Sequence, residues 1–115
     1  MKGVFEDRPT LGFAVNDWVS NAATAEETHG AISGWDTSRV DDMSELFKDK
    51  TTFNAQLDWD TSKVTNMQYT FRGAKAFNSE LVWDTSKVTT MAQTFDRAVL
   101  YDPPLAWAPR QVTTM

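Results

Sequence analysis

One feature constrains the fold of this chain more than any other: a block of residues recurs with a period of 24. The aligned blocks read GWDTSRVDDMSELF, DWDTSKVTNMQYTF, VWDTSKVTTMAQTF and AWAPRQVTTM, and their tryptophans are Trp35, Trp59, Trp83 and Trp107. A fixed period of this length is typical of stacked coils, in which each repeat buries its apolar face only against its neighbours. We therefore predict a small solenoid.

The period divides the chain of 115 residues into two regions, and its length fits one domain. We expect residues 1–34 to form an N-terminal helical cap and residues 35–115 to form the solenoid. The predicted repeats are 35–58, 59–82, 83–106 and a partial repeat, 107–115. Such a cap would cover the apolar surface that the first coil otherwise exposes.

The cap region predicts two helices. Apolar residues recur at helical spacing over 11–22, so we expect a helix there with Thr10 as its N-cap and Asn21 at its end. A second, shorter helix should start at Thr24 and end at Gly30, because glycine is common just after the last helical turn.

Each repeat is expected to contain one short strand, one helix and a return loop. The β-branched segment Thr-Ser-Lys-Val-Thr favours a strand, and successive strands would pair in parallel at roughly 4.8 Å. Apolar residues over 67–77 recur at helical steps, with Asp42 and Glu45, or Thr90 and Gln93, as capping pairs. The predicted fold class is therefore an α/β solenoid.

Stacking would make equivalent side chains of successive coils neighbours. The four tryptophans should then form one column, whose offset aromatic contacts each contribute about 0.5–1.5 kcal/mol beyond burial. The last block departs from the pattern, because Asp-Thr-Ser-Lys becomes Ala108-Pro109-Arg110-Gln111. We expect this end of the solenoid to be open.

Composition excludes several functions. The chain has no cysteine and a formal net charge of −5, whereas phosphate binding needs a basic stripe. We therefore expect no nucleic-acid partner, no anionic membrane surface and no thiol chemistry. No apolar run reaches transmembrane length, so membrane insertion is not expected, and no signal peptide is visible.

The repeat motif W-D-T-S-K-V-T-N-M, followed by x-x-T-F-x-x-A-x-x-F-N, resembles the BspA-like leucine-rich repeats of bacterial and protist surface proteins. It is most similar to the variant with roughly 25-residue repeats found in mycoplasma-type lipoproteins. The resemblance covers about residues 35–115, and the 18–30 region looks like the helical leader of such repeats. It implies right-handed leucine-rich-repeat-like coils, an extracellular or cell-surface location and, in some members, adhesion or host-protein binding.

From these observations we expect a noncatalytic module that binds a protein or a glycan, because repeat proteins bind through extended surfaces. The side chains expected on the binding face are Thr37, Arg39, Thr61, Lys63, Thr85 and Lys87. The alternative is a structural scaffold that associates with itself through the open C-terminal end. No cofactor is expected.

Other recurring polar residues have a structural and a functional interpretation. Stacked Asp36, Asp60 and Asp84 could hold calcium. We favour a structural role, in which each carboxylate accepts hydrogen bonds from backbone N–H groups and sets a turn. A column of Asn54, Asn78 and Asp102 is expected to bond loop backbone. The threonine columns, 37/61/85 and 65/89/113, could bind ice, but we favour β-propensity and cross-strand threonine pairing.

We expect no catalysis. His29 is the only histidine, and it has no serine or cysteine motif that would make a nucleophile and base pair. Its expected position at the end of the second cap helix suits a cation near the helix dipole. Glu26 and Glu27 are expected to be solvated.

Overall fold

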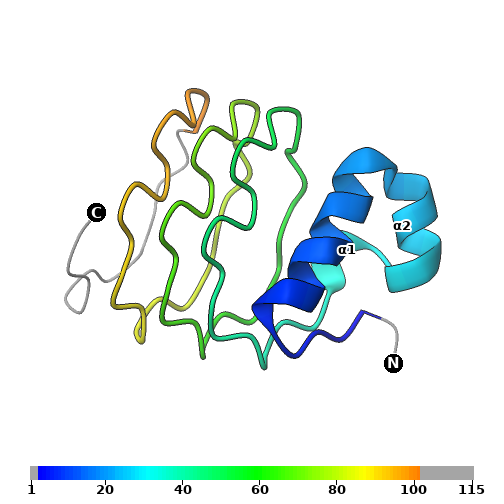
Figure 1. Ribbon diagram of the computed structural model, residues 1–115, viewed down its shortest axis with the longest axis horizontal. Helices are drawn as coiled ribbons and strands as arrows, with labels where there is room; N and C mark the ends of the chain where they lie inside the picture. Colours follow the sequence, from blue (N-terminus) through cyan, green and yellow to red (C-terminus); the bar gives the residue numbers. More distant parts are fainter. Residues whose placement is uncertain (1–2, 102–115) are drawn as a thin grey trace.

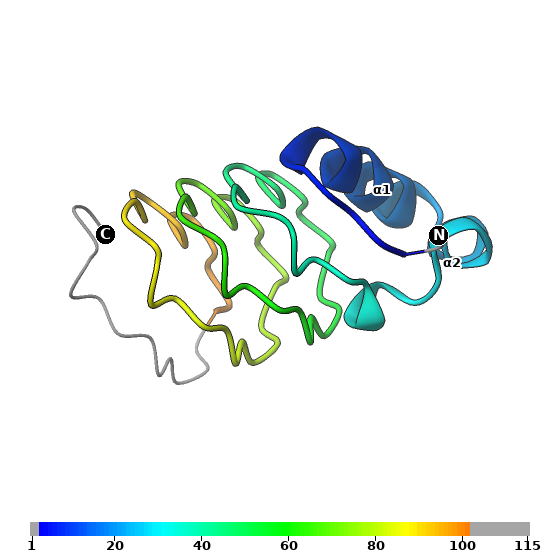
Figure 2. The same cartoon turned by 90° about the horizontal axis from the view of Figure 1, so that it is seen from below.

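The computed structural model describes residues 3–101. Two helices, α1 (Arg8–Ser20) and α2 (Ala22–His29), and a short 3-10 helix, η1 (Ile32–Gly34), come first along the chain. Three coils of irregular chain then stack side by side, and α1 lies against the first of them (Figures 1 and 2).

The two expected cap helices are present, but both begin earlier than expected, α1 at Arg8 and α2 at Ala22 rather than Thr24. Asp7 is the N-cap of α1, because its side chain accepts from the Thr10 N–H at 3.0 Å; Thr10 itself is inside the helix. Asn21 ends α1 as expected and also caps α2, where its side chain accepts from the Thr24 N–H. Gly30 ends α2 with a φ of 82°, a conformation that glycine adopts without strain.

The predicted strand and helix in each repeat are wrong, and the α/β solenoid of leucine-rich-repeat type is overturned with them. Between residues 35 and 101, the structure contains neither a strand nor a helix. In this described part of the chain, the only β-bridges between the coils are isolated and parallel, Asp42 with Asn66 and Asn66 with Thr90. Each coil is instead a succession of tight turns.

The segment that was expected to be a helix shows the physical reason. The Tyr69 N–H donates to the Ala92 carbonyl of the next coil at 3.0 Å, whereas the Thr70 N–H donates to the Met67 carbonyl within its own coil at 3.2 Å. This alternation places Tyr69 and Gly73 in the left-handed region, with φ of 61° and 74°. An α-helix would need an unbroken series of bonds to the fourth residue back.

The expected helix-capping pairs and strands also form turns. The Asp42 side chain accepts from the Ser44 N–H at 2.8 Å, which makes a local Asx turn in place of a capping box. In the Thr-Ser-Lys-Val-Thr segment, the Val64 N–H donates back to the Thr61 carbonyl at 3.0 Å. Backbone N–H groups that bond within a turn are not available for the continuous hydrogen-bond ladder of a β-sheet.

The core consists of aromatic columns that run from coil to coil. Trp59 stacks between Trp35 and Trp83, with ring centroids 6.2 and 6.1 Å apart and interplanar angles of 13° and 8°. The predicted tryptophan column is therefore confirmed for these three residues, and Trp107 lies outside the described residues. Two further columns stack in the same way: Phe47, Phe71 and Phe95, and Phe53, Phe77 and Tyr101.

The first coil differs from the others at the position where it meets the cap. In the later coils, the buried hydroxyls of Thr70 and Thr94 each donate to a methionine carbonyl of the preceding coil. The first coil has Leu46 at this position, buried beside α1. Arg8 of α1 adds a hydrogen bond from Nε to the Ser44 carbonyl at 2.7 Å.

Within the part of the chain that the structure describes, neither helix is long and apolar enough to cross a membrane.

Candidate functional site

The exposed residues of the expected binding face lie in one row. On one side of the row, the Thr37 and Thr61 hydroxyls donate to the carbonyls of Asp60 and Asp84 in the next coil. On the other side, the backbone N–H groups of residues 65 and 89 donate to carbonyls of residues 41 and 65. These hydrogen bonds fix the register of successive coils on both sides of the row. Equivalent residues one coil apart are therefore neighbours, and the basic row consists of Arg39, Lys63 and Lys87.

The threonines of the predicted face do not belong to that surface. Thr37, Thr61 and Thr85 are only 0, 1 and 3% exposed. They form a buried polar row beneath the basic one, and the first two hydroxyls bind carbonyls between coils. The prediction that these threonines lie on the binding face is therefore wrong, and their role is structural.

The three basic residues of the row differ in their surroundings. Arg39 Nη1 lies 2.8 Å from Glu6 Oε1, and both side chains are largely exposed, so this ion pair contributes little to stability. Lys63 and Lys87 are exposed, and within residues 3–101 neither has a carboxylate at ion-pair distance. They are the cations of this row that a partner can reach directly.

The aspartates beside this row set turns, as the structural interpretation predicts. Oδ1 of Asp60 accepts from the Ser62 N–H at 2.9 Å and from the Ser62 hydroxyl at 2.6 Å, and Asp36 and Asp84 also accept from the serine two residues later. Hydrogen bonds from these serines hold the pKa of all three carboxyls below the ordinary value of 3.8. Among the described residues, no cluster of three metal-ligating side chains occurs.

The outer threonine column is exposed, but its hydroxyls already have acceptors. Thr65 Oγ1 donates to the Asp41 carbonyl at 3.2 Å, and Thr89 Oγ1 donates to the Thr65 carbonyl at 3.3 Å. Thr113 lies outside the described residues. These contacts support pairing between coils at Thr65 and Thr89.

The asparagine column has its expected structural role where it is described. Asn54 Oδ1 accepts from the Asn78 N–H at 2.7 Å and from the Ser79 hydroxyl at 3.0 Å, so it ties one loop to the next. Asp102 lies outside the described residues, as does the 107–115 end through which self-association was predicted.

His29 is a packing residue of the cap. Its ring centroid lies 5.7 Å from that of Trp35 and 5.9 Å from that of Phe5. Its Nε2 lies 3.4 Å from Oδ2 of Asp17. The ring therefore covers the first member of the tryptophan column.

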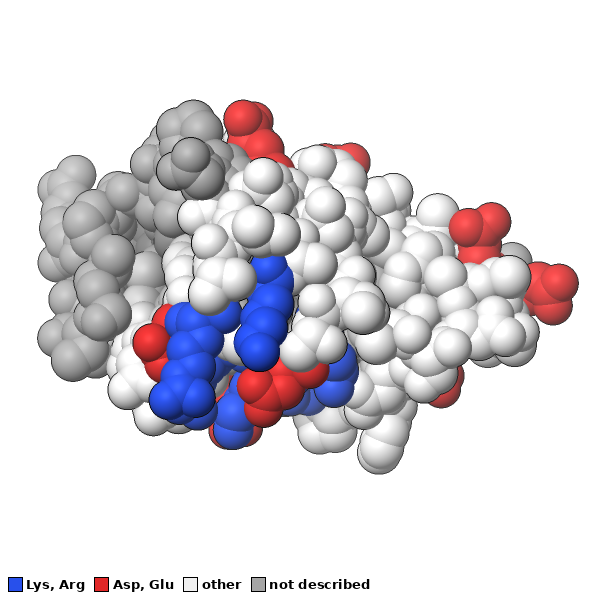
Figure 3. Space-filling model, turned by 90° about the horizontal axis from the view of Figure 1, so that it is seen from above, with Lys and Arg blue, Asp and Glu red and all other residues white. Residues whose placement is uncertain are grey.

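Sequence reasoning missed a second charged cluster. Figure 3 shows Lys and Arg gathered on one face with Asp and Glu between them. Lys48 and Arg72 flank the ring of Tyr69, at 5.9 and 5.6 Å from its centroid, and Arg72 also pairs with Asp96 at 3.0 Å. Glu45 is 3.4 Å from Lys48 in the same coil, so the cluster pairs its cations with carboxylates both within a coil and between coils.

A signal for that cluster exists in the aligned repeats. Positions 45/69/93 read Glu, Tyr and Gln, and positions 48/72/96 read Lys, Arg and Asp. These positions vary between repeats, whereas Met43/67/91 and Phe47/71/95 beside them are kept, and variable positions of a repeat carry its individual surface. The differences between the aligned repeats, and not only their shared motif, therefore indicate the charged cluster.

The fold and its polar surfaces define a class of protein: short, irregular repeat coils stacked beneath a two-helix cap. The family described as "Mycoplasma protein of unknown function, DUF285" matches residues 1–115. The chain belongs to this mycoplasma-type family. Comparison with curated proteins and with solved structures found no match.

Proposed function

We propose that this protein is a noncatalytic module that binds a protein or a glycan, and that the row of Arg39, Lys63 and Lys87 makes the contact. The observation that carries the proposal is the register of this row. Hydrogen bonds between coils fix the backbone on both sides of it. A rigid backbone lowers the entropy that binding costs.

The charge pattern indicates what the row would recognise. The chain is acidic overall, with a net charge of −5, yet this row presents cations beside the aspartates at 36, 60 and 84. The charge of Arg39 or Lys87 lowers the pKa of the aspartate three residues before it. Alternating charge of this kind gives specificity for a partner with complementary charged groups.

The proposed location is extracellular or at the cell surface. It is supported by the resemblance of the repeat motif to BspA-like surface proteins, some of which act in adhesion. That resemblance carries the location and the ligand class only, because the coils lack the strand and helix of leucine-rich repeats.

Binding of the chain to an array of extracellular-matrix proteins and glycans, with and without calcium, tests the proposal. The double variant Lys63→Glu, Lys87→Glu should weaken a saturable interaction by about a hundredfold, because reversing charge replaces attraction by repulsion at two contacts. Its melting temperature should not change, since both side chains are exposed.

The matched control is Lys75→Glu, Arg97→Glu, which changes the net charge equally at two other exposed positions. It should bind like the unaltered chain. Equal weakening by both double variants would show nonspecific attraction, and unchanged binding by the Lys63/Lys87 variant would exclude the row.

A further inference from the structure

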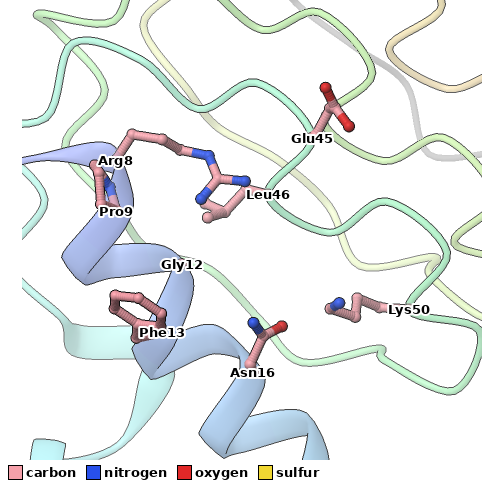
Figure 4. Close-up of a pocket in the computed structure, with 8 residues that line it drawn as sticks. All are labelled: Arg8, Pro9, Gly12, Phe13, Asn16, Glu45, Leu46 and Lys50. Carbon is pink, nitrogen blue, oxygen red and sulfur yellow. The ribbon is translucent and has the colours of Figure 1, made fainter.

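A groove separates the cap from the first coil. The side chains that the argument uses come from α1 and from the first coil: Arg8, Gly12, Phe13, Asn16, Leu46 and Lys50 (Figure 4). The groove holds about 280 Å³, just below the range of about 300–1,000 Å³ that is typical of small-molecule sites. It shares no lining residue with the basic row.

Two cations border this groove from opposite sides. Arg8 donates a hydrogen bond from Nε to the Ser44 carbonyl. Its guanidinium extends across the groove toward Leu46 in Figure 4. The Lys50 ammonium points into the groove from the coil. Within residues 3–101, no carboxylate lies at ion-pair distance from either cation, so both are available to an anion.

The remaining polar groups of the groove reinforce this arrangement. The Asn16 side chain points into the groove from α1 (Figure 4) and can donate a hydrogen bond. Glu45 also lines the groove, but its carboxylate points away from Arg8 and Lys50 in Figure 4 and lies 3.4 Å from Lys48. The one acid among the lining residues that the structure describes is therefore paired with a cation outside the lining.

Gly12 makes room for the guanidinium. A Cβ at this position would collide with Nη1 of Arg8. That atom is the far end of a flexible side chain, which could move aside. Gly12 therefore allows the observed place of the guanidinium without requiring it.

An apolar contact lies beside the charged ones. Phe13 is 71% exposed, although the other large apolar residues of α1 face the core. Exposed aromatic residues that adjoin polar donors are typical of recognition surfaces. A ligand that carries a carboxylate next to an apolar side chain would use both parts of the groove.

We infer that this groove binds an acidic peptide segment of a partner protein, with a Glu or Asp carboxylate between Arg8 and Lys50 and an adjacent apolar side chain against Phe13. The inference is independent of the proposed function, because it uses other residues. Arg8 would orient the carboxylate through its fixed guanidinium, and Asn16 would bind the peptide backbone.

Fluorescence anisotropy with an array of labelled pentapeptides, each with Glu or Asp beside Leu or Phe, tests the inference. Lys50→Glu should weaken the best peptide at least about tenfold, because it replaces a charge contact by a repulsion. Phe13→Ser should weaken it as well, but should not affect a peptide whose apolar residue is replaced by glycine. Lys75→Glu is the matched control and should bind normally.

Three results would overturn the inference. The first is no peptide binding at millimolar concentration, and the second is equal binding by the unaltered chain and by Lys50→Glu. The third is that inorganic phosphate or heparin, but no peptide, binds with the same dependence on Lys50, which would assign the groove to simple anions or to a glycan. Unchanged peptide binding by Lys63→Glu, Lys87→Glu would separate this groove from the basic row.

Discussion

At the scale of single residues, the coils depend on positions with positive φ. Glu45, Asp49, Tyr69, Gln93 and Arg97 all adopt φ between 53° and 62°, a region that costs a residue with a side chain about 1–2 kcal/mol. Only the second coil places a glycine, at 73, where the neighbouring coils have Asp49 and Arg97. The bonds between coils outweigh this local strain.

We expect Gly73→Ala to lower the free energy of unfolding by about 1–2 kcal/mol, because φ there is 74°. The added Cβ would also collide with the Asp49 carboxylate. Urea unfolding measures the total cost. Repeating the substitution in an Asp49→Ala background removes the collision, so the cost that persists there is the backbone strain. A Gly73→Ala variant as stable as the unaltered chain would contradict the left-handed conformation.

At the scale of elements, the stacked columns replace regular secondary structure as the source of order. Trp59 contacts a ring on either side and donates from Nε1 to the Ile32 carbonyl at 2.7 Å. The equivalent Trp83 bond goes to Leu57 at 3.2 Å. Each tryptophan therefore joins its own coil to the chain that precedes it, by packing and by one directed bond.

Trp59→Ala should lower the free energy of unfolding by about 3–5 kcal/mol, because it leaves a cavity in the middle of the column. Trp59→Phe should cost less, since a ring remains and the Ile32 carbonyl loses only its side-chain donor. Guanidinium unfolding followed by circular dichroism measures both. If the alanine variant resisted proteolysis as well as the unaltered chain does, the tryptophan column would not be what stabilises the fold.

At the scale of the whole molecule, the repeated hydrogen bonds between serine and aspartate make the stability of the chain depend on pH. The three aspartates that set the turns have pKa values below 3.8 because serine groups donate to their charged forms. Asp7 has a lowered pKa for the same reason, through Thr10. In the unfolded chain these bonds are absent, so each carboxyl there binds a proton at a higher pH.

We expect stability to fall in acid. A carboxyl whose pKa is depressed in the folded state contributes stability above its unfolded value of 3.8, and it loses that contribution as the pH falls through the folded value. Urea unfolding at pH 6, 4, 3 and 2.5 should therefore show a decline below about pH 4. Asp60→Asn keeps an acceptor but does not titrate, so its decline should be shallower. Equal stability of the unaltered chain at pH 6 and 2.5 would contradict the prediction.

The amino-acid sequence by itself determined what repeats and what stacks. The 24-residue period fixed the coil length and predicted the tryptophan column, and the helical spacing over 11–22 predicted the first cap helix. The aspartates of the turns and Asn54 were also assigned correctly. Each of these properties depends on residue type and on spacing along the chain.

The tertiary structure alone decided the conformation inside each coil and the direction of its side chains. Met67, Phe71 and Phe77 have helical spacing, yet they lie in tight turns, because every second N–H group from residue 67 to residue 73 donates to a carbonyl 23 residues further along the chain. Another contact between coils, from the Thr37 hydroxyl to the Asp60 carbonyl, turns Thr37 inward, whereas Lys63 is exposed. The groove at Arg8 and Lys50 arises only where the cap meets the first coil. Local propensity carries no information about such distant partners, so they could not be predicted from the pattern.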